Sequence, residues 1–132
     1  MDSNIERIIK NLIKVAKKDK DVVAIVLYGS FVKKPHFKDI DVCLMLKPKK
    51  YRNIYLTEKR LKYIKLVPEI VDIQIFQQLP VYIRKKILEE GKILLNKDFD
   101  ESFKLALSTI KEFDLFKPHY YYYLKSVENG KL

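Results

Sequence analysis

Two aspartates, Asp39 and Asp41, stand one residue apart in an apolar stretch that favours a β-strand. Because side chains alternate along a strand, both carboxylates are expected on one face, with Ile40 and Val42 on the other. Neighbouring carboxylates repel each other, and a divalent cation between them relieves that repulsion. Hard oxygen ligands favour magnesium or manganese. An isolated Asp-x-Asp pair is also found on the solvated face of an edge strand, so the flanking residues decide between the two interpretations.

The residues before this pair favour a site. Val22 to Tyr28 are apolar or β-branched and predict a buried strand that ends at a tight turn, Gly29-Ser30. Gly29 also leaves room for a ligand. The loop from Phe31 to Lys38 then carries Lys33, which could neutralise phosphate groups beside a bound metal. A mobile, charged surface loop is the alternative interpretation of this segment.

Residues 22–46 as a whole, with a strand, Gly29-Ser30, a loop and Asp39-Ile-Asp41 on a second strand, resemble the signature of the polymerase-beta-like nucleotidyltransferase superfamily. That resemblance implies a third carboxylate on a later strand. The run from Glu69 to Phe76 offers Asp72, which shares one strand face with Ile70 and Gln74. An acid between Val and Ile is disfavoured in a strand unless something uses it.

The bulk composition indicates one globular domain. The chain has 132 residues, 48% hydrophobic and 33% charged, and we expect a single domain over 1–132 with its motif core at 22–76 and a C-terminal helical segment at 98–128. Its formal charge of +10 suits an anionic ligand such as a nucleotide, a nucleic acid or an acidic protein. A single cysteine, Cys43, fits a reducing compartment and a place in the core. Without a signal peptide or an apolar run of roughly 18 to 20 residues, we expect a cytoplasmic protein with no membrane contact.

Helical periodicity and turn residues place the other elements. They predict an opening helix from Ser3, a helix over 51–65 with Ile54, Leu61 and Ile64 on its apolar side, a short helix ending at Glu90, and a strand at 92–95. The expected fold is α/β, with a short mixed sheet of about four strands flanked by helices and the active site at the Gly29-Ser30 end.

The C-terminal segment is predicted to begin as a helix capped by Asp98 or Asp100, and Pro118 is predicted to interrupt it. The side chains expected to form a core stripe on this helix are Phe99, Phe103, Ala106, Leu107 and Ile110. Tyr120 to Tyr123 follow, and four consecutive residues of a helix cannot all face inward, so some must be exposed. Exposed tyrosines suit a protein interface or base stacking, and we favour the interface.

Nearly the whole chain resembles the minimal nucleotidyltransferases, in particular the MntA-like antitoxins that accompany HEPN-domain toxins. Glu90-Gly-Lys-Ile-Leu-Leu95 and Asp114-Leu-Phe-Lys-Pro118 stand where those proteins carry related motifs. The resemblance implies that Gly29 and Ser30 hold a triphosphate. It also implies that Asp39, Asp41 and Asp72 bind two magnesium ions, with manganese as an alternative. Lys33 takes the place of a family arginine, and Asp72 is the candidate to accept the proton of the incoming hydroxyl.

The leading hypothesis is an enzyme that moves AMP from ATP to a hydroxyl, such as that of a tyrosine in a cognate HEPN toxin. One alternative is an antitoxin that neutralises its toxin by binding alone. Transfer of a nucleotide to a small molecule or to RNA is another. The aromatic C-terminal segment could be covered by the toxin or by a second copy in a homodimer.

Overall fold

The computed structural model describes residues 3–29 and 39–130. In this part of the chain the strands are β1 (Val22–Tyr28), β2 (Ile40–Leu46), β3 (Val71–Ile75) and β4 (Lys92–Asn96), and they form one sheet in the order β3-β2-β1-β4. β1 is antiparallel to β2 and to β4, whereas β2 and β3 are parallel. The prediction of a short mixed sheet of about four strands is confirmed.

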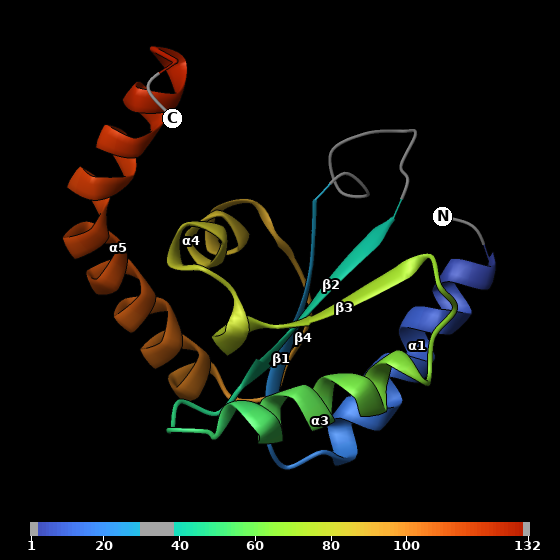
Figure 1. Cartoon of the computed structure of the whole chain (residues 1–132). Helices are drawn as coiled ribbons and strands as arrows, with labels where there is room; N and C mark the ends of the chain where they lie inside the picture. Colours follow the sequence, from blue (N-terminus) through green and yellow to red (C-terminus); the bar gives the residue numbers. More distant parts are fainter. Residues whose placement is uncertain (1–2, 30–38, 131–132) are drawn as a thin grey trace.

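Helices cover both faces of this sheet (Figure 1). α1 (Ser3–Lys18) and α3 (Asn53–Ile64) pack on one face, and α4 (Val81–Glu90) and α5 (Phe99–Glu128) pack on the other. A short 3-10 helix, η1 (Phe76–Gln78), links β3 to α4. No helix within the described ranges is long and apolar enough to cross a membrane. The α/β fold predicted from the sequence is therefore observed, with the sheet between two helical layers.

Alternation along β2 divides the core between these layers. Val42 and Leu44 pack toward α1 and α3, while Cys43 and Met45 pack toward α4 and α5. Cys43 is fully buried, and burial raises the pKa of its thiol, so it is a core residue as expected. Asp41 shares the Cys43 face of the strand, which places its carboxylate on the α4 and α5 side of the sheet.

The apolar side predicted for the second helix is confirmed only for Ile64, which packs against the core. Ile54 and Leu61 are 59% and 49% exposed, and α3 instead packs through Leu56 and Tyr63. Tyr63 can be buried because its hydroxyl donates a hydrogen bond to the carboxylate of Asp19, 2.8 Å away. The helix is therefore rotated relative to the prediction.

The stripe predicted as core on the last helix is also wrong. Phe99, Phe103, Leu107 and Ile110 are 69%, 50%, 40% and 44% exposed. α5 packs instead through buried side chains on a neighbouring face, namely Leu105, Thr109 and Phe113. Asp98 caps the helix as predicted, accepting a hydrogen bond from the backbone N–H of Glu101 at 3.1 Å.

Pro118 does not interrupt α5, contrary to the prediction. A proline inside a helix removes one backbone hydrogen bond and usually bends the helix. Here aromatic contacts join the two sides of Pro118: the ring of Tyr120 lies 6.3 Å from that of Phe113, 5.6 Å from that of Phe116 and 5.4 Å from that of Tyr82 in α4. These contacts hold the second half of the helix in line. Figure 1 shows α5 curving around α4 before its last turns extend beyond the sheet.

Candidate active site

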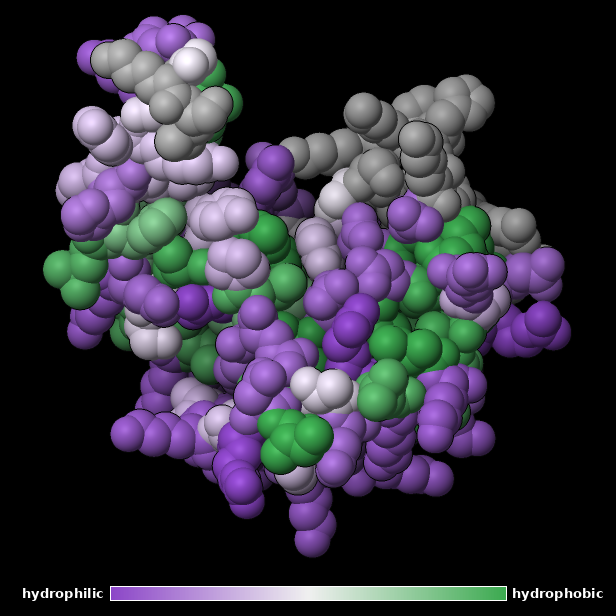
Figure 2. All heavy atoms as spheres, viewed as in Figure 1, coloured by the Kyte–Doolittle hydropathy of each residue, from purple (hydrophilic) through white to green (hydrophobic). Residues whose placement is uncertain are grey.

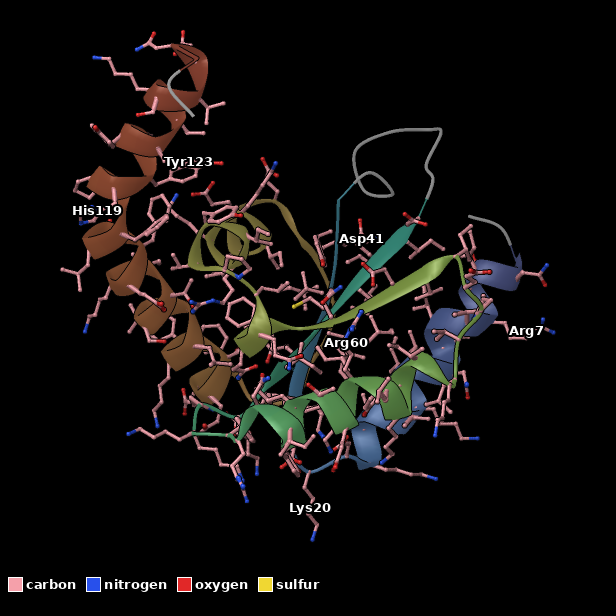
Figure 3. The ribbon with its side chains drawn as sticks, viewed as in Figure 1. Arg7, Lys20, Asp41, Arg60, His119 and Tyr123 are labelled. Carbon is pink, nitrogen blue, oxygen red and sulfur yellow. The ribbon has the colours of Figure 1, made fainter. Side chains whose placement is uncertain are left out.

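Three polar residues occupy adjacent positions across neighbouring strands. Tyr28 on β1 pairs with Asp41 on β2, and Asp41 pairs with Asp72 on β3. Residues directly opposite each other in a sheet point to the same face, with Cβ atoms about 5 Å apart. The sheet therefore brings Asp41 and Asp72 side by side although 30 residues separate them, and Figure 3 shows Asp41 at the start of β2.

Gly29 lies against the carboxylate of Asp41. Its φ of +76° is in the left-handed region, which favours glycine. A Cβ atom at this position would lie 2.2 Å from Asp41 Oδ2, well inside contact distance. The space beside Gly29, predicted to admit a ligand, is thus occupied by the Asp41 side chain itself, and any larger residue would displace that carboxylate.

Asp72 is held by Gln74, which was predicted on the same strand face, and by Arg60, which the sequence pattern did not indicate. Gln74 Nε2 donates to both carboxylate oxygens, at 3.1 and 3.3 Å. The guanidinium of Arg60, on α3, lies 3.6 Å from Asp72 Oδ1, and its Nε donates to the backbone carbonyl of Ile73 at 2.7 Å. Figure 3 shows Arg60 directed from α3 toward the sheet. The carboxylate of Asp72 therefore has a defined orientation.

A buried ion-pair network fixes α3, and with it Arg60. Lys59 Nζ lies 3.0 Å from Asp19 Oδ2 and 3.1 Å from Asp21 Oδ2, and both aspartates stand in the turn between α1 and β1. Burial raises the pKa of Asp19, but hydrogen bonds from Lys59, from the Asp21 backbone N–H and from Tyr63 together outweigh it and lower the pKa overall. Asp19 is therefore ionised at neutral pH and anchors the helix.

A sequence signal for these basic residues existed. The buried residues Leu56 and Tyr63 are seven positions apart, and Lys59 and Arg60 lie between them at i+3 and i+4, on the same helical face. The apolar side predicted through Ile54, Leu61 and Ile64 did not include that face.

Negative charge accumulates at the Asp41 end of the sheet. Burial raises the pKa of Asp41, and the charges of Asp72 and Asp39 raise it further. Burial also raises the pKa of Tyr28, with added contributions from nearby groups that include Asp41 and Asp72. Tyr28 therefore stays protonated and can act as a hydrogen-bond donor, while the carboxylates would be relieved by a bound cation.

The chemistry of these residues fits a divalent cation, although the site is not preassembled. Asp41 and Asp72 offer hard oxygen donors from adjacent strand positions. Yet within residues 3–29 and 39–130 no three acidic, histidine or cysteine side chains are close enough to hold a metal ion. Since Arg60 and Gln74 engage the Asp72 carboxylate, that group would exchange part of its contact with Arg60 for the cation. The donors fit, and binding would require this local rearrangement.

A pocket of about 440 Å³ opens beside Asp39 and Asp72 at the free edge of β3. Asp39 and Asp72 line one part of it, and Ile64, Val67 and Pro68 supply apolar surface. Its volume is in the range of small-molecule sites, roughly 300 to 1,000 Å³. An apolar wall facing carboxylates suits a flat ring that carries a polar reacting group.

The predicted site residues are only partly brought together. Asp41, Asp72 and Gly29 lie close to one another, and Asp39 is exposed immediately before β2, where it lines the pocket. Ser30 and Lys33 lie outside the described residues, so their proposed contacts with a triphosphate stay predictions.

Comparison with known sequences finds a match over most of the chain. The family described as polymerase beta, nucleotidyltransferase, matches residues 10–100. A candidate protein adenylyltransferase of Methanocaldococcus jannaschii is 34% identical over 83 residues, which are 61% of this chain and 62% of that relative. The chain thus matches a little under two thirds of the relative's length.

Solved structures of toxin-antitoxin complexes contain the same fold. A chain of the tri-AMPylated HEPN toxin in complex with MNT antitoxin, from Shewanella oneidensis, aligns with a TM-score of 0.67 at 18% identity, over 93% of this chain and 98% of that one. A chain of a toxin-antitoxin crystal structure with AMP-PNP gives 0.68 at 19% identity, over 91% and 98%. An MntA mutant complex gives 0.69 at 17%, over 91% and 98%. The predicted resemblance to MntA-like proteins is confirmed in the fold.

Proposed function

Because this chain belongs to the polymerase beta nucleotidyltransferase family, we propose that it transfers AMP from ATP to a hydroxyl group of a protein. The observation that carries the proposal is the strand register that sets Asp41 beside Asp72, which itself lines a pocket large enough for a tyrosine side chain. The similarity to a candidate protein adenylyltransferase supports the reaction class.

We propose that the acceptor is a tyrosine of a HEPN-domain toxin and that this chain acts as its antitoxin. The related Shewanella oneidensis complex contains an AMPylated HEPN toxin bound to its MNT antitoxin. In the pocket at the edge of β3, the apolar side chains of Ile64, Val67 and Pro68 would contact the aromatic ring, and its hydroxyl would face Asp72.

Each residue then has a defined part in the reaction. Asp39, Asp41 and Asp72 would hold one or two magnesium ions, which when bound neutralise charge on the triphosphate. Ser30 and Lys33 would receive the phosphates, and Gly29 leaves the space beside it to the Asp41 side chain. The acceptor oxygen bonds to the α-phosphorus of ATP while the bond from that phosphorus to the bridging oxygen breaks, so pyrophosphate leaves. The acceptor proton passes to Asp72, whose carboxylate Gln74 and Arg60 keep in place.

Intact-mass spectrometry tests this proposal. The protein would be incubated with ATP, magnesium and a HEPN-domain protein encoded next to it, beside Asp72→Asn and the surface control Leu115→Lys. We expect the HEPN protein to gain adenylyl groups with the wild type and the control, and none with Asp72→Asn. Leu115 of α5 is 81% exposed, so its replacement tests whether a surface substitution away from the aspartates changes the transfer of AMP.

The other outcomes separate the alternatives. A stable complex with an unmodified HEPN protein would move the function to neutralisation by binding. Pyrophosphate release that requires an added small molecule or RNA would move it to those acceptors.

A further inference from the structure

One face of the helix α5 packs against the rest of the molecule. Leu105, Thr109 and Phe113 are buried against the rest of the molecule, and the rings of Phe116 and Tyr120 stack with Tyr82 of α4. Arg84 forms an ion pair with Glu112 at 2.8 Å, and Lys85 Nζ lies 4.6 Å from the centre of the Phe113 ring. This face fixes α5 on α4.

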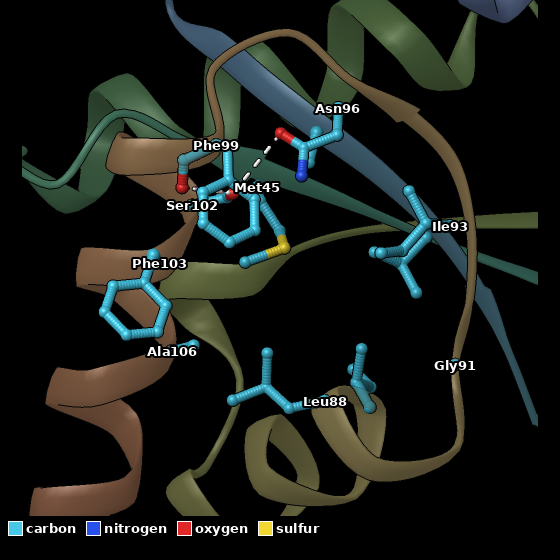
Figure 4. Close-up of a pocket in the computed structure, with 12 residues that line it drawn as sticks. Met45, Leu88, Gly91, Ile93, Asn96, Phe99, Ser102, Phe103 and Ala106 are labelled. Carbon is cyan, nitrogen blue, oxygen red and sulfur yellow. Dashed lines mark hydrogen bonds between the residues drawn. The ribbon is translucent and has the colours of Figure 1, made fainter.

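A second face of α5, about 100° around the helix, is apolar and exposed. Leu107, Ile110, Tyr121 and Leu124 expose 40%, 44%, 56% and 42% of their surface. Figure 2 shows apolar patches among the hydrophilic side chains on the face of the molecule that it draws. Toward the start of the helix this face continues into Phe103 and Phe99, which line a pocket of about 180 Å³ between α5, α4 and β4 (Figure 4). We call residues 103, 107, 110, 114, 117, 121 and 124 the α5 seam.

The α5 seam has the spacing of a coiled-coil contact. Its positions alternate by four and three residues, which is the a and d pattern of a heptad. Two charged residues, Asp114 and Lys117, stand at the middle of the seam, and apolar residues lie on both sides of them. Both charged side chains are exposed.

This arrangement is complementary to itself when two copies of the helix run antiparallel. If the two-fold axis passes between residues 115 and 116, Asp114 lies opposite Lys117 of the second copy, and Lys117 opposite its Asp114. The same register sets Ile110 opposite Tyr121 of the second copy and Leu107 opposite its Leu124. Each is an a-to-d pairing, as in antiparallel coiled coils, and a self-complementary patch is what a two-fold dimer requires.

The charges exclude the competing arrangements. In a parallel pair Asp114 would face Asp114 of the second copy, and Lys117 would face its Lys117. A shift of one heptad in the antiparallel pair would place Asp114 against an apolar residue, Ile110 or Leu124 of the second copy. Unfavourable pairings of this kind select one register over the others.

We propose that α5 joins two copies of this chain as an antiparallel helix pair along the α5 seam. Pairing the exposed side chains of the seam would bury a total area on the order of 1,000 Å² over both copies, which is near the lower limit for specific interfaces. We therefore expect a weak, concentration-dependent dimer. Asp72 lies on β3, at the opposite edge of the sheet from β4, which leads into α5, so we expect dimerisation to leave it uncovered.

Charge reversal tests the pairing in the full chain. The two-fold axis creates two equivalent pairs between residues 114 and 117. Asp114→Lys would place two lysines opposite each other in both pairs, and Lys117→Asp would place two aspartates opposite each other in both. We expect each to weaken dimerisation at least tenfold in sedimentation over micromolar to submillimolar concentration. The double variant Asp114→Lys, Lys117→Asp restores both pairs and is expected to regain the wild-type association. Both side chains are exposed, so we expect the variants to fold. Leu115→Lys serves as a surface control that leaves association unchanged.

A double variant that stays as weak as the single variants would overturn the proposal, as would a wild-type chain that sediments as a monomer throughout. If Leu107→Lys abolished complex formation with a HEPN-domain protein while the wild type alone stayed monomeric, the seam would belong to that partner and the proposal would equally fall. None of these readouts depends on nucleotide transfer.

Discussion

Replacing Gly29 by alanine is expected to have two effects: it strains the backbone, and it pushes the carboxylate of Asp41 away. The left-handed φ of +76° costs an alanine about 1 to 2 kcal/mol relative to glycine. In addition, the new Cβ would lie 2.2 Å from Asp41 Oδ2, and ordinary contact begins at 3.4 Å, so the carboxylate must retreat by about 1 Å. Turning that side chain away from its preferred rotamer adds about 1 kcal/mol.

Two consequences of different size follow. The free energy of unfolding is expected to fall by about 2 to 3 kcal/mol, which urea titration measures. The rate of AMP transfer is expected to fall about 100-fold, because a catalytic group displaced by 1 Å typically loses that much. Transfer would be measured at protein concentrations and temperatures where the variant is folded by circular dichroism.

Gly130 supplies a matched control. Its φ of +70° is nearly the same, but a Cβ there would meet no atom within 4 Å. Gly130→Ala therefore carries the backbone cost without the collision, and transfer is expected to be unchanged. If Gly29→Ala transferred AMP within threefold of the wild type, the close approach of Asp41 to Gly29 would have no role in the reaction.

Three further predictions concern other parts of the molecule. Gln74→Met removes both N–H donors to Asp72 at nearly constant volume, so manganese affinity measured by calorimetry is expected to fall about 10-fold or more, with little change in melting temperature; an unchanged affinity would contradict the positioning role. Because the pKa of Asp19 is lowered from its ordinary value of 3.8, the ionised carboxylate stabilises the fold at any pH above 3.8, and this stability is lost as the pH falls through the folded pKa. In urea titrations Asp19→Asn should therefore be less stable than the wild type at pH 7, with the difference shrinking below about pH 4. Pro118→Ala restores a backbone hydrogen-bond donor in α5. The free energy of local opening at residues 119–128 should rise by up to about 3 kcal/mol, which slower amide hydrogen exchange would show.

Strand patterns were sufficient to predict the sheet and the strand positions of Asp41 and Asp72, whereas Asp39, predicted on the second strand, lies just before it. Alternation in Ile40–Leu46 and Val71–Ile75 indicates which residues share a face, and the connection through α3 makes the two strands parallel. Register followed from the buried face, because a slip by one residue would bury Asp41 and Asp72 among Leu44 and Ile75.

Helix faces were predicted less well, for a physical reason. On α3 the buried face contains Lys59 and Arg60, whose partners Asp19 and Asp72 are distant in sequence, so local hydrophobicity pointed to Ile54 and Leu61 instead. On α5 a continuous apolar stripe does lie on one face, but the buried face is a different one, and no local feature distinguishes a face that packs within the molecule from one left exposed.

The sheet order also affects how such a protein can diverge over generations. The aspartates lie on β2 and β3, whereas β4, which leads into α5, is attached on the opposite side of β1. Substitutions along β4 and the exposed face of α5 can therefore accumulate without moving Asp41 or Asp72. A duplicated copy could acquire a new binding partner while its reaction chemistry is inherited intact.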